Sequence, residues 1–171
     1  MSKKALPWFP AAAHGEIDKL RTMLEAKVNI NATDKKGRTA LILAVVKDQL
    51  PCVQFLIDAK ADLEVKQTDG STALMEAITE GLPDAAKLLI DAKADIECRD
   101  DEGMTPLTCA LFDEQTECVE LLIDAKADVN GQDKSGMTPL YLAVANSDIE
   151  SARALLDAKA NVDPIVENGM N

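Results

Sequence analysis

The residues of this chain that could carry acid–base or nucleophilic chemistry are few and scattered. His14 is the single histidine, and no serine or cysteine nucleophile stands beside it in the sequence. A Ser-His-Asp or Cys-His arrangement needs a base that a third group orients. One histidine without such neighbours does not supply that arrangement, so we interpret His14 as a surface loop residue and expect neither catalysis nor a cofactor.

The cysteines and the densest acidic turn do not have the spacing of a metal site. No CxxC pair or partner histidine accompanies the cysteines, and the turn formed by Asp100, Asp101 and Glu102 lacks the alternating oxygen ligands of an EF-hand. We expect no metal. Cys98 is predicted to lie in an accessible loop, and the remaining three are interpreted as small core residues: Cys52, Cys109 and Cys118.

No segment of the sequence indicates a membrane or a secretory route. The longest apolar run, around 39–46, is far too short to span a bilayer. Lys3 and Lys4 are not followed by an apolar core of signal-peptide length. We therefore expect a cytoplasmic protein with reduced thiols and no membrane partner.

The strongest pattern in the sequence is a series of glycines at a fixed spacing. It indicates the repeated framework that must position the other residues. Gly37, Gly70, Gly103 and Gly136 are each 33 residues apart, and a threonine and then a leucine follow each at the same interval. A period of this length indicates one supersecondary unit stacked on itself. We expect a single domain over 1–171, with an N-terminal cap at 1–33, repeats at 34–66, 67–99, 100–132 and 133–165, and a tail at 166–171.

Each unit is predicted to contain a turn, two short helices and a loop. In the fourth unit, Asp100 opens a tight turn that Gly103 closes, because glycine adopts a left-handed backbone without steric cost. Thr105 suits the helix N-cap and Pro106 the first helical position. The second helix is predicted at about 116–124.

These motifs resemble the ankyrin repeat. The resemblance rests on Thr-Pro-Leu at 105–107 and 138–140, an alanine three residues later, and Ala-Asp-Val-Asn at 127–130. It implies an all-α solenoid of stacked helix pairs with short hairpin loops at one edge, whose concave face typically binds proteins. The histidine that the family places after Thr-Pro-Leu is absent, so we expect packing to replace its hydrogen bonds.

A second departure from the family is a lysine in place of the glycine after every second helix. A left-handed lysine costs roughly 1–2 kcal/mol. Either the helix continues and the turn shifts, or the ammonium group faces the helix C-terminal carbonyls, with weak ion pairs to the preceding aspartates. The lysines are Lys27, Lys60, Lys93, Lys126 and Lys159.

Both ends of the stack are expected to be capped by polar residues. Lys19 stands where later units have Cys52, Ala85 or Cys118, and Ser151 and Arg153 interrupt the apolar positions of the last unit. The residues at 166–169 are expected to begin a further turn. Two interpretations stay open here: the chain is part of a longer array, or the tail folds over the last helices.

The net charge of −12 is distributed unevenly. Residues 1–66 are slightly basic, and the remainder carries −15. Such a field repels phosphate backbones, which argues against nucleic acid as a partner. It attracts a basic protein or peptide.

The positions that the repeat leaves free predict a binding surface in the last two units. An apolar patch with a charged rim is typical of protein interfaces. The predicted patch contains Met104, Phe112, Met137 and Tyr141, bordered by Asp69, Glu80, Asp101, Glu102 and Asp113.

We therefore predict a non-catalytic, monomeric module that binds a basic and apolar protein or peptide surface. Two alternatives remain: a structural spacer or fragment of a longer ankyrin scaffold, and the regulatory part of an enzyme.

Overall fold

The computed structural model of this chain describes residues 7–162 and contains only helices as regular secondary structure over that range. The chain divides into two compact units, Met1–Asp95 and Ile96–Asn171, which are described separately. The first contains α1 (Trp8–Ala13), α2 (Ile17–Glu25), α3 (Ala40–Val46), α4 (Leu50–Asp58), α5 (Ala73–Thr79) and α6 (Pro83–Asp91). The second contains α7 (Pro106–Phe112), α8 (Thr116–Asp124), α9 (Pro139–Ala145) and α10 (Ile149–Asp157).

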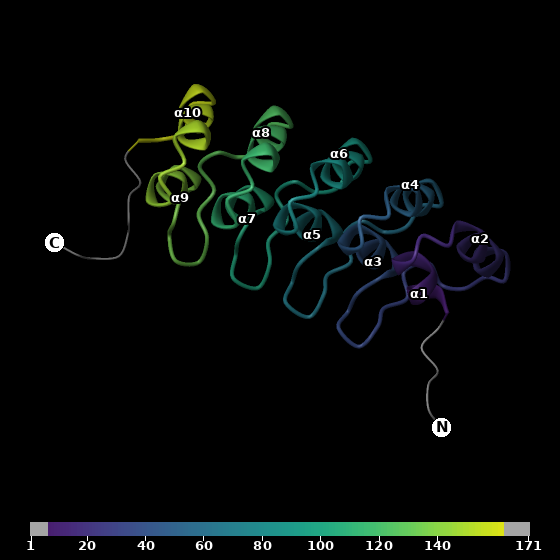
Figure 1. Cartoon of the computed structure of the whole chain (residues 1–171). Coiled ribbons are helices and arrows are strands. Elements are labelled where there is room, and N and C mark those ends of the chain that lie inside the picture. The colour runs from purple at the N-terminus through teal and green to yellow at the C-terminus, as the bar shows by residue number, and fades with distance from the viewer. Residues whose placement is uncertain (1–6, 163–171) are drawn as a thin grey trace. The chain divides into compact units, whose positions relative to one another are not determined.

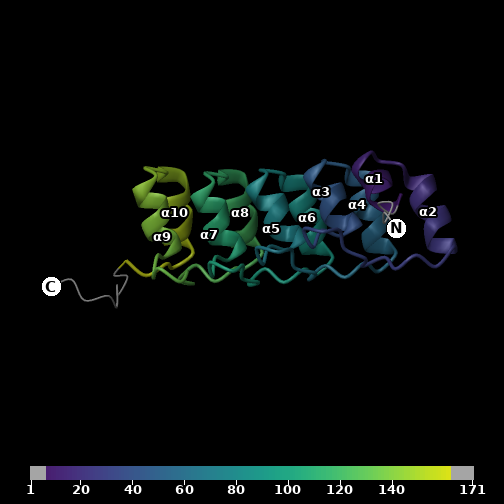
Figure 2. The ribbon, with the colours of Figure 1, turned by 90° about the horizontal axis from the view of Figure 1, so that it is seen from below.

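Within each unit the helices form antiparallel pairs that stack in two rows. In the first unit α3 packs between α1 and α5, and α4 contacts α6. In the second unit α7 packs on α9 and α8 on α10 (Figure 1). Within each unit, the hairpin loops that lead into the helix pairs project from one edge, as the turned view in Figure 2 also shows. The predicted all-α stack of helix pairs is confirmed, while one domain over 1–171 stays a prediction.

The first helix of every pair except the N-terminal one begins at a threonine N-cap. The hydroxyl oxygen of Thr39, Thr72, Thr105 or Thr138 accepts a hydrogen bond from the backbone N–H three residues later, which satisfies one of the free donors of the first turn. Thr108 stands where the family has histidine, and its hydroxyl accepts a bond of 2.7 Å from the Thr105 N–H. This bond lies within one repeat and closes a capping box with Thr105, so the expectation that packing replaces the hydrogen bonds of the histidine between repeats stays a prediction.

All five second helices end with the lysine in the left-handed region, with φ between +59° and +72°. After α8, the N–H of Lys126 donates to the Ile123 carbonyl and the N–H of Ala127 to the Leu122 carbonyl, both at 3.0 Å. This is the Schellman arrangement that usually selects glycine. The alternative in which the helix continues is therefore wrong. Among residues 7–162, no ion pair joins one of these lysines to the preceding aspartate.

The core of each unit consists mainly of alanine and leucine, and it also holds the cysteines. All four cysteines are free and buried. Cys98 is only 7% exposed, so the prediction of an accessible thiol is wrong. Burial raises the pKa of the Cys118 thiol to about 11 and that of Cys109 further still, which keeps both protonated and unreactive.

The two ends of the described chain differ in polarity. Lys19 on α2 is exposed, as expected of a polar cap. The last helix pair instead exposes several large apolar side chains, among them Val144 and Ile149 at 64% and 72%. The prediction of a polar cap at the C-terminal end is therefore wrong for α9 and α10.

Candidate protein-binding surface

Two consecutive hairpins of the second unit form the base of the candidate site. An aspartate opens each hairpin, and its Oδ1 accepts two backbone N–H groups: those of Glu102 and Met104 for Asp100, at 2.9 and 2.8 Å. Asp133 does the same in the next hairpin, where it accepts from Met137 at 2.9 Å. These bonds fix the hairpin backbone that carries each methionine.

The hairpins are also joined to each other through Lys134. Its backbone N–H donates to the Glu102 carbonyl at 3.2 Å, and its ammonium donates to the Asp101 carbonyl. Gly103 lies opposite with φ +80°, and a Cβ there would come within 2.9 Å of Cγ of Lys134. Glycine is therefore required both for the turn and for the close approach of the neighbouring hairpin.

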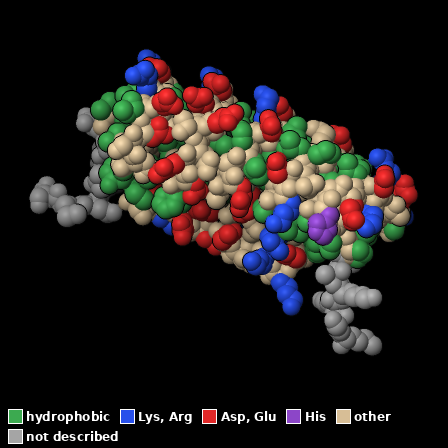
Figure 3. All heavy atoms as spheres, viewed as in Figure 1, with side chains coloured by type: hydrophobic (Ala, Val, Ile, Leu, Met, Phe, Trp, Pro, Cys, Tyr) green, Lys and Arg blue, Asp and Glu red, His purple; other side chains and the backbone are tan. Residues whose placement is uncertain are grey.

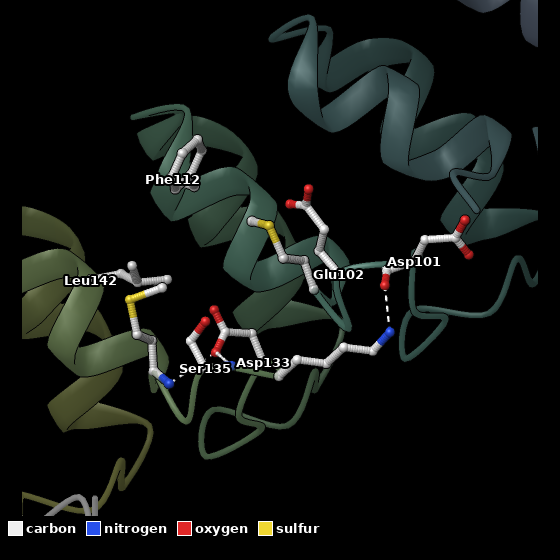
Figure 4. A pocket seen from close by; sticks show the side chains of 9 residues that line it. Asp101, Glu102, Phe112, Asp133, Ser135 and Leu142 are labelled. Atoms are coloured by element: carbon white, nitrogen blue, oxygen red, sulfur yellow. Dashed lines mark hydrogen bonds between the residues drawn. The ribbon is translucent and has the colours of Figure 1, made fainter. Parts of the chain in front are cut away.

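A pocket of about 310 Å³ opens above these hairpins, between them and the helices α7 and α9 (Figure 4). Its lining combines apolar side chains with carboxylates. The lining residues are Asp101, Glu102, Met104, Phe112, Asp133, Lys134, Ser135, Met137 and Leu142.

Phe112 is the most exposed apolar side chain of the pocket. It is the last residue of α7 and is 60% exposed, whereas Met104 and Met137 are half-buried and Leu142 is buried. Phe112 therefore belongs to the surface of the second unit and not to its core. An aromatic ring held by a helix end, beside flexible thioethers, presents apolar surface that adapts to different contours.

The structure brings five of the nine predicted site residues around this pocket: Met104, Phe112, Met137, Asp101 and Glu102. Tyr141 and Asp113 do not line it. Tyr141 is 51% exposed on α9, and Asp113 is the half-buried C-cap of α7. Asp69 and Glu80 belong to the first unit, where both are exposed.

Sequence reasoning missed four lining residues: Asp133, Lys134, Ser135 and Leu142. In the repeat register, Asp133 is the equivalent of the turn residue Asp100, and Leu142 is the equivalent of Cys109. The 33-residue register gives a signal for the other two, since Lys134 and Ser135 are the equivalents of Asp101 and Glu102. Hairpin tips that share a register position lie next to each other in a stack.

Negative charge predominates around the pocket and over the second unit as a whole. Residues 96–171 contain five basic and sixteen acidic residues, whereas residues 1–95 contain thirteen and fourteen. Figure 3 shows acidic side chains gathered over the second unit. A cationic ligand is therefore attracted to this unit more than to the first.

Residues 7–162 contain neither a cluster of metal ligands nor a membrane-spanning helix. No group of three or more histidine, cysteine or acidic side chains in this range is placed to hold a metal ion. No helix in it is long and apolar enough to cross a membrane.

The comparison with known families agrees with the helix pairs and their 33-residue spacing. The sequence model described as ankyrin repeats, in three copies, matches residues 9–100 and 92–166. The chain belongs to the ankyrin-repeat family. Ankyrin repeats are in general protein–protein interaction modules, so the hairpin-lined pocket lies on a fold that commonly binds proteins.

The ankyrin chain is also similar to parts of two larger proteins. Over 58 residues it is 47% identical to the ankyrin repeat protein YahD of Escherichia coli, a match that covers 33% of this chain and 29% of YahD. Over 49 residues it is 41% identical to the palmitoyltransferase akr1 of Schizosaccharomyces pombe, covering 28% of this chain and 8% of that protein. The chain matches less than a third of the length of either relative.

Proposed function

We propose that this ankyrin chain is a non-catalytic binding module whose second unit takes a protein segment that combines basic and large apolar residues. The observation that carries this proposal is Phe112, which stands 60% exposed at a pocket whose other apolar members are two methionines and a leucine. Exposed aromatic rings beside a pocket are frequent energetic centres of interfaces.

The charges of the site favour a basic partner. The pocket lining contains Asp101, Glu102 and Asp133 and a single cation, Lys134. Lys134 already donates to a backbone carbonyl, and Asp133 accepts two backbone N–H groups. Asp101 and Glu102 are exposed and are thus the carboxylates that a lysine or arginine of the partner would meet first.

The size of the pocket favours one large apolar side chain at its centre. A volume of about 310 Å³ is at the small end of ligand sites, and it accommodates a leucine, methionine or phenylalanine of a peptide more readily than a cofactor. Basic residues on either side of that anchor would then lie over the acidic hairpins. The four free cysteines are consistent with the cytoplasmic location expected from the sequence.

Selection from a random peptide library displayed on phage tests this proposal without a known partner. Peptides that bind the wild-type chain should combine lysine or arginine with a large apolar residue, and their affinity should fall steeply as salt is added. Phe112→Ala should weaken the selected peptides about tenfold, which corresponds to about 1.4 kcal/mol. Fluorescence anisotropy with the labelled peptides measures both effects.

Tyr141→Ala is the matched control, because it removes a similarly exposed aromatic ring that does not line the pocket. Its affinity for the peptides should stay within about twofold of the wild-type value. Enrichment of acidic peptides, or equal losses from the two variants, would contradict the proposed site.

A further inference from the structure

An arginine outside the pocket is bonded to both of the hairpins that form its base. Nη1 of Arg99 donates to the carbonyl of Gly103 in the first hairpin and to the carbonyl of Gln132 just before the second, both at 2.7 Å. Arg99 is not one of the residues that line the pocket. Any effect of Arg99 on a bound segment is therefore exerted through the hairpins.

The two carbonyls belong to the peptide bonds that lead into two pocket residues. The Gly103 carbonyl precedes Met104 and the Gln132 carbonyl precedes Asp133, and both of the following residues line the pocket. Because one nitrogen bonds to both oxygens, these oxygens lie no further apart than the sum of the two hydrogen-bond lengths. Arg99 thus limits how far the backbone at Met104 can move from the backbone at Asp133.

The guanidinium also lies against the segment that leads into the second hairpin. A Cβ on Gly131 would be in ordinary contact with Nη2 of Arg99, at 3.6 Å. Hydrogen bonds from a charged donor are roughly twice as strong as those between neutral groups. In the repeat register, the equivalents of Arg99 are Thr33, Lys66 and Gln132. The guanidinium therefore occurs at this position in the repeat whose hairpin carries the first methionine of the pocket.

Lys134 makes a second connection between the same hairpins. Its backbone N–H donates to the Glu102 carbonyl, and its ammonium donates to the Asp101 carbonyl, the bond that Figure 4 draws as a dashed line at Asp101. Two of the five basic residues of 96–171 thus donate to backbone carbonyls of these hairpins. Hairpins that are already held in place lose less conformational freedom when a ligand binds.

We propose that Arg99 is a positioning residue of the pocket, which sets the distance between the two hairpins and thereby selects the apolar side chain that the pocket accepts. This inference rests on the peptide site proposed above. With the hairpins held, the walls of the pocket keep a fixed separation around the apolar anchor of a bound segment. Without Arg99 the walls move apart more freely, so affinity falls and anchors of different size bind alike.

The charge of Arg99 and its positioning effect act in opposite directions on a basic ligand. Removal of a cation from the acidic second unit increases its attraction for a basic peptide, whereas release of the hairpins weakens binding. A loss of affinity in Arg99→Leu is therefore not an effect of charge. Arg153→Leu is the matched control, because it removes the same charge from an exposed position of α10 outside the pocket. It should bind basic peptides at least as tightly as the wild type does.

Fluorescence anisotropy with the peptides selected on the wild-type chain tests the proposal. Arg99→Leu should bind a selected peptide about tenfold more weakly. Replacement of the apolar anchor of that peptide by alanine should cost about tenfold on the wild type and about twofold or less on Arg99→Leu, a coupling that a double-mutant cycle measures. Arg99→Lys should restore most of the affinity and of the anchor preference, because both bonds come from one nitrogen and an ammonium has three donors.

A role in stability alone would give a different result. A less stable domain loses affinity for every peptide in the same proportion, and Arg99 is exposed, so circular dichroism should show its variants folded. Equal anchor costs on the wild type and Arg99→Leu, or equal affinities of Arg99→Leu and Arg153→Leu, would overturn the proposal. If Phe112→Ala still weakens binding in those cases, the proposed function stands without it.

A measurement without peptide decides the positioning of the hairpins even if the selection yields no peptide. The NMR signals of the ε-methyl groups of Met104 and Met137 should shift and broaden in Arg99→Leu. They should keep their wild-type positions in Arg153→Leu and return to them in Arg99→Lys. Unchanged signals in Arg99→Leu would overturn the proposal, whereas shifted signals after a failed selection would contradict the proposed ligand and not the role of Arg99.

Discussion

At the scale of single residues, Lys126 illustrates a backbone conformation imposed against the preference of the side chain. Its φ of +72° lies in the region that favours glycine. The two backbone hydrogen bonds after α8 and the burial of Ala127 hold it there. The strain is thus offset by the end of the helix and by the apolar residue that follows.

Replacing this lysine should therefore stabilise the protein. Lys126→Gly should raise the free energy of unfolding by about 1 kcal/mol, because glycine reaches this conformation without the steric cost of a Cβ. Denaturation by urea measures the difference. Lys126→Ala keeps the Cβ and removes the charge, so it should give no gain. A loss of stability in Lys126→Gly would instead mean that the ammonium contributes more than the strain costs.

Glu76 is a second residue whose environment opposes its charged state. It lies half-buried on α5, where its Oε1 accepts a hydrogen bond of 2.6 Å from Nε2 of Gln67. Burial and then the nearby charges of Asp69 and Glu80 raise the pKa of its carboxyl, although the Gln67 bond acts in the opposite direction. The native state therefore binds the proton more tightly than the unfolded chain does.

This difference makes a prediction about pH. Stability should decrease as the pH rises from the unfolded-state pKa through the raised native pKa, since ionisation is then less favourable in the folded chain. Glu76→Gln keeps the acceptor and removes the charge. It should be more stable than the wild type at neutral pH and equal to it at a pH below both values. Thermal melts at several pH values check this, and an advantage that is independent of pH would contradict the assignment.

At the scale of elements, the sequence predicted the helices closely because their ends depend on local chemistry. The Thr105 N-cap and Pro106 at the first position were confirmed, and the second helix spans Thr116–Asp124 as predicted. Capping threonines and turn glycines act within a few residues, so the local sequence alone specifies where these helices begin and end.

The predictions that failed concern whether a residue faces the core or the solvent. Cys98 lies in a loop, and its burial depends on the packing of neighbouring segments, which loop position does not reveal. Tyr141 was predicted to be part of the apolar patch, yet it occupies the register position of Thr108, which is 0% exposed. A comparison of register positions would have assigned Tyr141 to the stacking side of α9.

At the scale of the whole molecule, charge is the dominant asymmetry. The second unit has eleven more acidic than basic residues, and the first has one more. Like charges at this density repel one another within the folded unit, and salt screens them over about 10 Å at 0.1 M.

Stability should consequently rise with ionic strength. The midpoint of thermal unfolding should increase when sodium chloride is added at neutral pH, because screening reduces the repulsion in the folded state more than in the expanded chain. Circular dichroism measures the midpoint. Glu117 and Glu120 are exposed on α8, and the double variant Glu117→Lys, Glu120→Lys should show a smaller increase. An equal increase in that variant would indicate a general salt effect.

The left-handed lysine after every second helix has a practical consequence for protein engineering. None of the five lines the pocket, and all five share one backbone geometry. A series of variants with one to five of them changed to glycine would give a set of molecules with graded heat resistance and an identical recognition surface. The thermal stability of this scaffold could then be changed without changing its affinity for a partner.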